Sequence, residues 1–341
     1  MWQEYLLFLL RTVTIVAAIG LVIGLVAGVI GRAQKKPDKG HIVVENLGEL
    51  VRKRREKVQE ALLADRKAVR RWRKQRKAEE KAERRRKDAE QPERRVWVID
   101  FKGDIQASEV RSLSESVTAV LGAARAGDTV LLRLESPGGT VPGYGLAASQ
   151  LQRLRDGGLT LWACVDKVAA SGGYMMACVA DRIHAAPFAI VGSIGVVAQI
   201  PNVHRLLRKH DIGVEMHTAG EYKRTLTVLG ENTKAGREKF REHLEGTHQL
   251  FKQHVAAARP ALDIDSVADG DHWYGHQAIE KGLVDELTTS DDVLLKLCTD
   301  HQVLRVSYEV PKTLSRRLSL SVVNLLELAF DRVLERIQPL R

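Results

Sequence analysis

In the middle of the chain, short apolar runs alternate with segments whose apolar residues recur every three or four positions. The runs Val96–Phe101, Thr129–Leu134 and Leu159–Val165 are typical of buried strands. Between them, Ser108–Ala126 and Tyr144–Arg155 have helical periodicity. Strands that alternate with helices form parallel βαβ units, so the pattern predicts an α/β domain with its sites at the carboxyl ends of the strands.

The second half of the chain continues this pattern less regularly. Val214–Thr218 is predicted to be a strand, and Lys234–Ala258 a long amphipathic helix. His272–Glu286 is predicted to be a helix that runs into a short strand. Leu314–Ile337 is a further amphipathic stretch, too charged to span a bilayer, which could pack on the domain, on a partner subunit or on a membrane surface.

The N-terminal region has a different pattern. Thr12–Ile30 is an uninterrupted run of 19 apolar and small residues, close to the roughly 20 needed to cross a bilayer. Trp2 and Tyr5 lie where an interfacial aromatic belt would fall. A cleavable signal peptide, the alternative, would have a basic start and a shorter apolar region of about 7–15 residues. We therefore expect a transmembrane anchor over residues 1–31.

Charge separates the next segment, residues 32–94, from the rest. Residues 31–95 hold 24 Lys and Arg against 12 Asp and Glu, whereas the whole chain has a net charge of +10. The basic character therefore belongs to one juxtamembrane linker and does not indicate nucleic-acid binding. The linker is predicted to be a solvated helix or disordered, with too few apolar positions for a coiled coil, and could bind anionic lipid.

The candidate nucleophile is Ser171. It lies where the predicted strand Leu159–Val165 leads through small residues into a helical pattern, and Gly172 and Gly173 follow it. Amides at a helix N-terminus stabilise negative charge, and glycines let a substrate carbonyl approach closely. The alternative is that Ser171 is a helix N-cap.

Three further positions could complete an acyl-transfer site. Ser136-Pro137-Gly138-Gly139 follows a predicted strand and could supply amides to an oxyanion hole, or be an ordinary turn. Ser193 is a lone polar residue in the apolar segment Ala189–Val197, where a backbone carbonyl could also satisfy it. Lys223 could be the general base, although a single lysine is usually a surface residue.

Other catalytic groups fit the sequence less well. No histidine lies in the four segments around Ser136, Ser171, Ser193 and Lys223, and Gly-x-Ser-x-Gly is absent around Ser171, which disfavours a Ser–His–Asp triad. Lys167 is a rival base, but its place at the end of a strand suits a carbonyl or carboxylate partner. Three cysteines without ligand spacing give neither a disulfide framework nor a zinc site. We expect no metal and no cofactor.

Together these segments resemble the serine peptidases of the bacterial signal peptide peptidase A group. The resemblance covers the anchor, the linker and the domain from Arg95 to about residue 300. The matching segments are Ser136–Gly139, Ala169–Tyr174, Gly192–Val196, Tyr222-Lys223 and Gly275–Glu286.

The resemblance implies a ClpP/crotonase-like fold of stacked ββα units. It implies Ser171 as nucleophile, Lys223 as general base, Ser193 as the residue that orients the lysine, and amides of Gly138, Gly139 and Gly172 as the oxyanion hole. It further implies a ring-shaped homo-oligomer that cleaves polypeptides at the bacterial inner membrane. The family favours the periplasmic face, whereas the cationic linker favours a cytoplasmic domain by the positive-inside rule.

The sequence thus predicts an anchor over 1–31, a linker over 32–94, a serine endopeptidase domain over 95–312 and a C-terminal amphipathic helix over 313–341. Its substrates would be membrane-associated or unfolded polypeptides such as signal-peptide remnants, and its partners would be the lipid bilayer and its own copies, with no nucleic acid. The alternatives are a catalytically silent membrane scaffold and a crotonase-like acyl-CoA enzyme, which shares the fold but needs carboxylate groups near its oxyanion hole.

Overall fold

The computed structural model describes residues 40–63, 65–89 and 94–310. The predicted anchor and the predicted C-terminal helix lie outside the described residues. The chain divides into two compact units, and the larger one, Ile42–Tyr308, contains every candidate site residue. In the part of the chain that the structure describes, no helix has both the length and the apolar character needed to cross a membrane.

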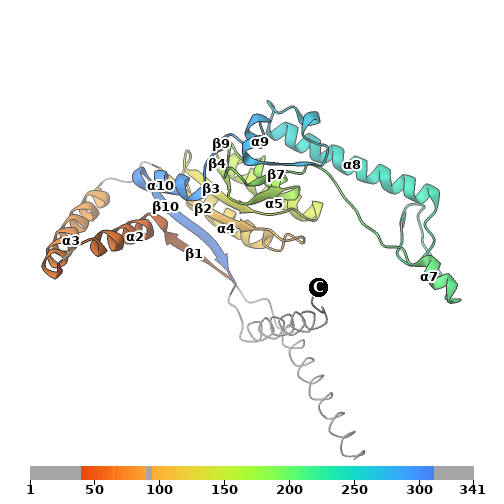
Figure 1. The fold of residues 1–341 in the computed structure, drawn as a ribbon, viewed down its shortest axis with the longest axis horizontal. Coiled ribbons are helices and arrows are strands. Elements are labelled where there is room, and N and C mark those ends of the chain that lie inside the picture. Colours follow the sequence, from red (N-terminus) through yellow and green to blue (C-terminus); the bar gives the residue numbers. More distant parts are fainter. Residues whose placement is uncertain (1–39, 64, 90–93, 311–341) are drawn as a thin grey trace, which may run out of the picture. The chain divides into compact units, whose positions relative to one another are not determined.

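The apolar runs form a seven-stranded sheet in the order β1-β10-β2-β3-β4-β6-β9 (Figure 1). All pairings from β10 to β9 are parallel, which confirms the predicted α/β class. The strands are β1 (His41–Asn46), β2 (Arg95–Lys102), β3 (Thr129–Glu135), β4 (Thr160–Val165), β6 (Arg182–Ala185), β9 (Glu286–Leu287) and β10 (Gln302–Glu309).

Strand β2 shows why these runs are almost continuously apolar. Successive side chains of a strand point to opposite faces of the sheet. Trp97, Ile99 and Phe101 belong to the larger core cluster, whereas Val96 and Val98 belong to a smaller one. Since apolar clusters cover both faces of the sheet, no position inside the strand has to be polar.

Helices from different parts of the chain build these two cores. The larger core receives side chains from α4 (Val110–Ala123), α5 (Val141–Asp156), α6 (Gly172–Ala177) and α8 (Lys234–Ala258). The smaller core receives side chains from α10 (Ser290–Asp300) and from Leu47 at the start of α2 (Leu47–Ala61).

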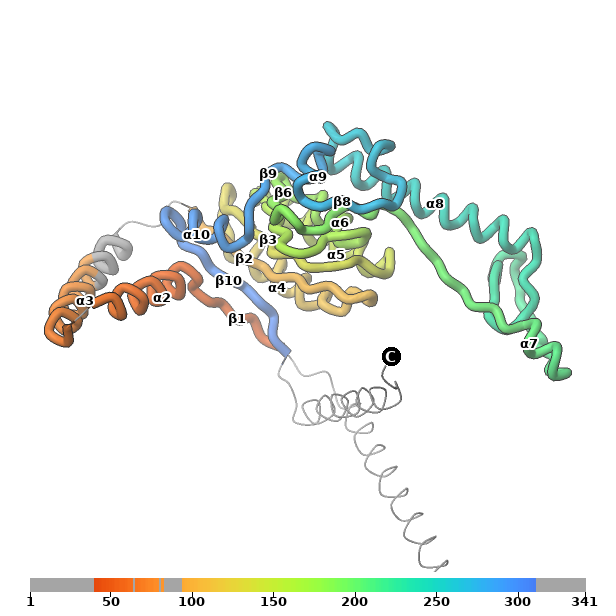
Figure 2. The backbone as a smooth tube through the Cα atoms, viewed as in Figure 1, coloured from red at the N-terminus to blue at the C-terminus, as the bar shows by residue number. Residues whose placement is uncertain are grey.

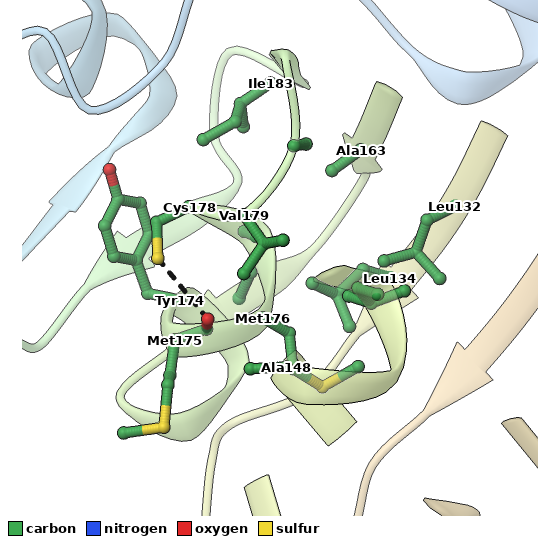
Figure 3. Close-up of a cluster of buried hydrophobic side chains, with 14 of the residues drawn as sticks. Leu132, Leu134, Ala148, Ala163, Tyr174, Met175, Met176, Cys178, Val179 and Ile183 are labelled. Atoms are coloured by element: carbon green, nitrogen blue, oxygen red, sulfur yellow. Dashed lines mark hydrogen bonds between the residues drawn. The ribbon is translucent and has the colours of Figure 1, made fainter. Parts of the chain in front are cut away.

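Helix α6 and the turn after it lie within the larger core. Figure 3 draws Met176 and Val179 together with Leu134 and Ala148, and all four belong to the larger core cluster. The Cys178 thiol donates a 3.3 Å hydrogen bond to the Met175 carbonyl. Burial raises the pKa of Cys178 to about 12, so this thiol is a core group and not a reactive one.

A second, three-stranded sheet places the segments that lead to Ser171 and Ser193 side by side. It consists of β5 (Val168–Ala170), β7 (Ile190–Gly192) and β8 (His272–Tyr274), in that order. β5 is parallel to β7, and β7 is antiparallel to β8. A bridge between Ser136 and Ala169 joins the end of β3 to β5. The 3₁₀ turn η1 (Ile264–Ser266) precedes this sheet's last strand, and α9 (Gly275–Glu280) follows it.

The edge of the main sheet joins two segments that are far apart in the sequence. β1 is paired with β10, and Arg305 of β10 donates a 2.7 Å hydrogen bond to Glu45 of β1. Figure 1 shows β1 beginning beside the end of β10. Because β10 is parallel to β2, this end lies on the carboxyl side of the parallel strands.

The charged linker forms two helices, α2 and α3 (Arg66–Ala89). Ion pairs join the helices: Arg73 contacts Glu60, and Arg76 lies 2.6 Å from Glu56. Of the two predicted states of this segment, solvated helix and disorder, the structure has the helix.

Between β7 and α8 the chain makes a long excursion, residues 196–233, here called the arm (Figure 2). Its regular structure is the short helix α7 (His204–Lys209), and the arm is held by its own bonds, such as Val203 N to Val228 O at 2.9 Å. The predicted strand Val214–Thr218 is not formed. Its apolar side chains, Val214 and Met216, are exposed and pair with no strand among the described residues.

Candidate active site

Ser171 occupies a strained backbone position between β5 and α6. Its φ of 52° and ψ of −119° are rarely adopted by residues other than glycine. Such positions cost about 1–3 kcal/mol and cluster at functional sites. The Ser171 amide donates to the Gly192 carbonyl over 2.8 Å, which holds the turn, while its side chain makes no capping bond to α6. Ser171 is therefore the N-cap residue of α6 by position, but its hydroxyl is not used to cap the helix.

The Ser136–Gly139 turn lies directly against Ser171. A Cβ added to Gly138 would lie 2.8 Å from both the Gly172 nitrogen and the Ser171 Cβ. Gly138 also has a φ of +91°, so glycine is required there on two grounds. The predicted association of this turn with the start of α6 is thus present in the fold.

The amides at this junction differ in their hydrogen bonds. The Gly138 amide donates to the Ser136 hydroxyl oxygen over 3.1 Å. Gly139 is exposed, and its amide has no hydrogen-bond partner among the described residues. The Gly172 amide is the first of α6, where helical amides lack partners within the helix. Of the three predicted oxyanion donors, Gly139 and Gly172 have amides that are not already bonded within the described chain.

Ser193 is one residue beyond the carbonyl that holds Ser171. It too has a positive φ, 52°, and its amide donates to the Asp271 carbonyl over 2.7 Å. Its hydroxyl donates to the Gly270 carbonyl over 3.3 Å, and not to Lys223. The fold therefore brings Ser193 to the junction but gives its side chain a different partner.

The fold does not bring Lys223 to Ser171 within one chain. Lys223 is an exposed residue of the arm, next to Tyr222, whose ring centre lies 5.0 Å from the Lys239 Nζ near the start of α8. Later residues of the same helix, including Phe251, line the cavity beside Ser171. Twelve residues of α-helix rise about 18 Å, so Lys223 and Ser171 are associated with different parts of α8.

An apolar cavity of about 370 Å³ opens beside Ser171. Its lining includes Val141 of α5, Met175 of α6, and Leu250 and Phe251 of α8. The contribution of α8 was not foreseen from the sequence. The helical periodicity of Lys234–Ala258 indicated an apolar face, but not what that face would cover.

The basic residues near this site are committed to other partners. Lys167 is exposed and lies 3.1 Å from Glu135, whose pKa is lowered by that hydrogen bond, as expected for a strand-end lysine with a carboxylate partner. His254 Nε2 lies 2.9 Å from the Met175 carbonyl oxygen, and His248 Nε2 lies 3.1 Å from that of Ile194. Within the described residues, no group of His, Cys, Asp or Glu is arranged to hold a metal ion.

The sequence matches two family descriptions that together cover most of the chain. Residues 1–151 match "Peptidase family S49 N-terminal" and residues 153–304 match "Peptidase family S49". These matches confirm the resemblance stated from the motifs.

Two relatives carry the name "Probable protease SohB". The protein of Haemophilus influenzae is 61% identical over 222 residues, 65% of this chain and 63% of the relative. That of Buchnera aphidicola subsp. Acyrthosiphon pisum is 54% identical over 232 residues, 68% of this chain and 69% of the relative. The matched part of the chain thus spans 63% and 69% of the lengths of these two relatives.

Solved structures show more distant similarity. A mutant of the 1510-N membrane-bound stomatin-specific protease, in complex with a substrate peptide, matches with 14% identity and a TM-score of 0.41, covering 67% of this chain and 97% of that one. A ClpP1 mutant from Listeria monocytogenes matches with 13% identity and a TM-score of 0.37, covering 58% of this chain and 94% of that one.

Proposed function

Since the chain belongs to peptidase family S49, we propose that it is a serine endopeptidase in which Ser171 is the nucleophile and Lys223 the general base. The observation that carries this proposal is the geometry around Ser171. A strained serine stands at the start of a helix, and its hydroxyl does not cap that helix. Two amides without partners among the described residues lie beside an apolar cavity.

The base would come from a second copy of the chain. A lysine can accept a proton only as the neutral amine, a form that desolvation favours. In the single chain, Lys223 is exposed. Exposed apolar side chains that gather on one segment indicate an interface. On the arm these are Val197, Ile200, Val203, Leu206, Ile212, Val214, Met216, Tyr222, Val228 and Leu229.

In the proposed assembly, a ring-shaped homo-oligomer, the arm packs on a neighbouring copy. It would bring Lys223 to that copy's Ser171 and desolvate the amine at the same time. Ser193 would then exchange its bond with Gly270 for one that orients the amine. The assembly would complete a site that one chain leaves unfinished.

The reaction would follow the usual course of acyl transfer. The Lys223 amine takes the Ser171 proton while Oγ attacks the peptide carbonyl carbon. The amides of Gly139 and Gly172 stabilise the negative oxygen of the tetrahedral intermediate. Lysine returns the proton to the leaving amine, and water then hydrolyses the acyl-enzyme. The protein, the substrate and water together supply every proton and every bond that these steps require.

The cavity suggests what the enzyme would accept. Its walls from α5, α6 and α8 are largely apolar, so a small or apolar side chain of the substrate would fit beside Ser171. Polypeptides that expose such side chains are unfolded or membrane-associated chains, including signal-peptide remnants. We propose these as the substrate class.

The apolar run Thr12–Ile30 would set the location of the protein, attaching it as a single-pass segment to the bacterial inner membrane. The bilayer would also be a partner of the cationic helix α3. A reporter enzyme that is active on one membrane face only, fused after the last residue, would identify the face on which the catalytic domain lies.

The proposed function is tested by labelling with a fluorophosphonate and by turnover of a fluorogenic peptide. Wild type should react, whereas Ser171→Ala should not be labelled and Lys223→Ala should lose about 10²–10⁴-fold in turnover, the usual contribution of a general base. Lys167→Ala, which removes a nearby exposed lysine, should retain wild-type turnover. Equal labelling and turnover in all four proteins would overturn the assignment and favour a silent membrane scaffold.

A further inference from the structure

Behind the glycine turn, two buried hydroxyl groups form a chain of hydrogen bonds. The Ser136 Oγ lies 2.5 Å from the Tyr144 hydroxyl oxygen, and both side chains are fully buried. The Tyr144 hydroxyl donates to the Asp104 carbonyl over 2.8 Å, and the Gly138 amide donates to the Ser136 Oγ over 3.1 Å. The proposed reaction does not use either hydroxyl.

The direction of each bond in this chain follows from the groups themselves. A backbone carbonyl can only accept, so the single proton of the Tyr144 hydroxyl goes to Asp104. Ser136 must then donate its own proton to the Tyr144 oxygen and accept from Gly138. Burial raises the pKa of Tyr144, so its proton is retained at neutral pH. Bonds that run in one direction strengthen one another.

This chain of hydrogen bonds ends at Asp104, in a loop that is itself held by further hydrogen bonds. The Asp104 carboxylate accepts from the Ser108 amide over 2.8 Å and from the Ser108 hydroxyl over 2.7 Å. A second contact joins the same loop to the glycine turn, from the Thr140 amide to the Ile105 carbonyl over 2.9 Å. Residues 104–108 therefore help to hold the Ser136–Gly139 turn in position.

The ring of Tyr144 also contacts the start of α6. A Cβ added to Gly172 would lie 2.7 Å from Cδ2 of Tyr144 and 2.8 Å from its Cβ. A Cβ added to Gly103 would collide with the hydroxyls of both Ser136 and Tyr144. One tyrosine thus touches the glycine turn by its hydroxyl and the first residue of α6 by its ring, which are the two segments that carry the proposed oxyanion amides.

On the basis of the proposed function, we propose that Tyr144 is a positioning residue of the oxyanion hole. Its hydroxyl, acting through Ser136, fixes the peptide unit of Gly138 and so directs the next amide, Gly139, toward the carbonyl that Ser171 attacks. Its ring sets the distance between that amide and the one of Gly172. Neither Tyr144 nor Ser136 contacts the reacting atoms.

The test compares Tyr144→Phe, Ser136→Ala and the double variant in the full chain, with peptide turnover as the readout. Small displacements of catalytic groups cost up to about 100-fold, so each single variant should lower kcat by about 10-fold to 100-fold with KM within about twofold of wild type. The double variant should be no slower than the slower single variant, because both changes break the same chain.

The matched control is Tyr174→Phe. Tyr174 is also fully buried, and its hydroxyl donates a 3.0 Å bond to the Leu283 carbonyl, away from the glycine turn. This variant should lose thermal stability as Tyr144→Phe does, but keep its kcat. The proposal is overturned if Tyr144→Phe keeps wild-type kcat, or if kcat falls equally in both tyrosine variants.

Hydrogen exchange separates this inference from the proposed function. In the wild type, the Gly138 amide is bonded to Ser136, so its exchange should be slow and should become faster in Tyr144→Phe but not in Tyr174→Phe. If the wild type neither labels nor turns over peptide, the proposed function fails and the exchange result alone decides the role of Tyr144 in holding the turn. Unchanged exchange in Tyr144→Phe would refute that role.

Discussion

Gly138 and Gly158 are a useful pair for comparison, because they share a backbone conformation but differ in what an added side chain would contact. Both have a positive φ, +91° and +77°. A Cβ on Gly138 would meet the Ser171 Cβ and the Gly172 nitrogen, whereas a Cβ on Gly158 would meet nothing within 4 Å. The two positions therefore separate the cost of the conformation from the cost of contact with the site.

We predict that Gly158→Ala loses about 1–2 kcal/mol of unfolding free energy, the cost of a left-handed alanine, and keeps its peptidase activity. Gly138→Ala should lose about 1–3 kcal/mol more, because the added methyl group overpacks the junction. It should also lose about 100-fold or more in kcat, because the oxyanion amides are displaced. Denaturant titration and peptide turnover measure both effects. Equal losses of activity in the two variants would contradict this account.

At this scale, the sequence located the candidate nucleophile and the glycines beside it, because small residues at a strand–helix junction leave a clear local pattern. It did not indicate Tyr144, which appeared only as the first residue of a predicted helix. Its hydroxyl meets Ser136 and Asp104, 8 and 40 residues away, and no local pattern shows which side chains meet across such distances. The roles of Ser171, Lys223, Ser193 and the three glycines stay predictions.

At the scale of elements, α3 presents a face that carries five exposed cations. Arg66, Arg70, Lys74, Lys77 and Lys81 lie on one side of the helix by its 3.6-residue repeat, and all five are exposed. None of them forms an ion pair with a described residue, whereas Arg73 and Arg76 on the adjoining side bind carboxylates of α2. Such a face is complementary to anionic lipid head groups, at about 1 kcal/mol per cation.

We predict that a nitroxide label at Ala78, an exposed residue at the margin of this face, becomes inaccessible to water-soluble relaxing agents in proteoliposomes that contain phosphatidylglycerol. Phosphatidylcholine alone, or high salt, should restore its accessibility. Neutralising Arg70, Lys74 and Lys77 to glutamine should weaken the contact by about 3 kcal/mol.

The control neutralises three exposed cations outside α3: Arg111, Lys234 and Lys296. It should leave the accessibility of the label at Ala78 unchanged. If the control has the same effect as the α3 variant, or if the lipid head group does not matter, α3 does not bind the bilayer. Protection by an acidic protein or nucleic acid but not by lipid would equally exclude the bilayer as its partner.

An ion pair joins the end of α8 to the sheet. Arg259 binds Asp285 through two bonds of 2.7 and 2.8 Å, and Asp285 also accepts the Ile183 amide over 2.7 Å. Burial alone would raise the pKa of Asp285, but these hydrogen bonds outweigh it and leave the pKa lowered. A lowered pKa in the folded state stabilises the fold above the unfolded-state pKa, about 3.9.

Wild type should therefore be more stable than Asp285→Asn by about 1–3 kcal/mol at neutral pH. This difference should shrink as the pH falls below about 4 and vanish below the folded-state pKa. Denaturant titrations across this range, with the exposed Asp263→Asn as control, measure it. A difference that does not change with pH would mean that Asp285 is not ionised in the folded protein.

The sequence predicted most central elements correctly, and the long helix Lys234–Ala258 has the predicted bounds. The helices among these elements have a strong helical periodicity of apolar residues, and the strands are continuous apolar runs, so both leave a clear local pattern. It did not predict β1 or β10, because β1 reads as part of a charged linker and its partner lies about 260 residues later. The expected strand at Val214–Thr218 was wrong because β-propensity is not sufficient where no neighbouring strand is available within the described chain.

At the scale of the whole molecule, the separation of Lys223 from Ser171 within one chain leads us to predict what happens when two different inactive variants assemble together. Two inactive variants, Ser171→Ala and Lys223→Ala, assembled together from unfolded or dissociated subunits, should regain part of the wild-type turnover, because in the proposed assembly a lysine from one copy meets a serine of another. The same variants kept apart should stay inactive. Mixed assemblies without any activity would show that both groups of a site come from one chain.

The sheet edge formed by β1 and β10 has a further consequence. The described chain enters at β1 and leaves at β10 on the same carboxyl side where the Ser136–Gly139 turn follows β3. If Ser171 has the proposed catalytic role, an anchor attached before β1 would hold the domain on the side where the Ser136–Gly139 turn lies.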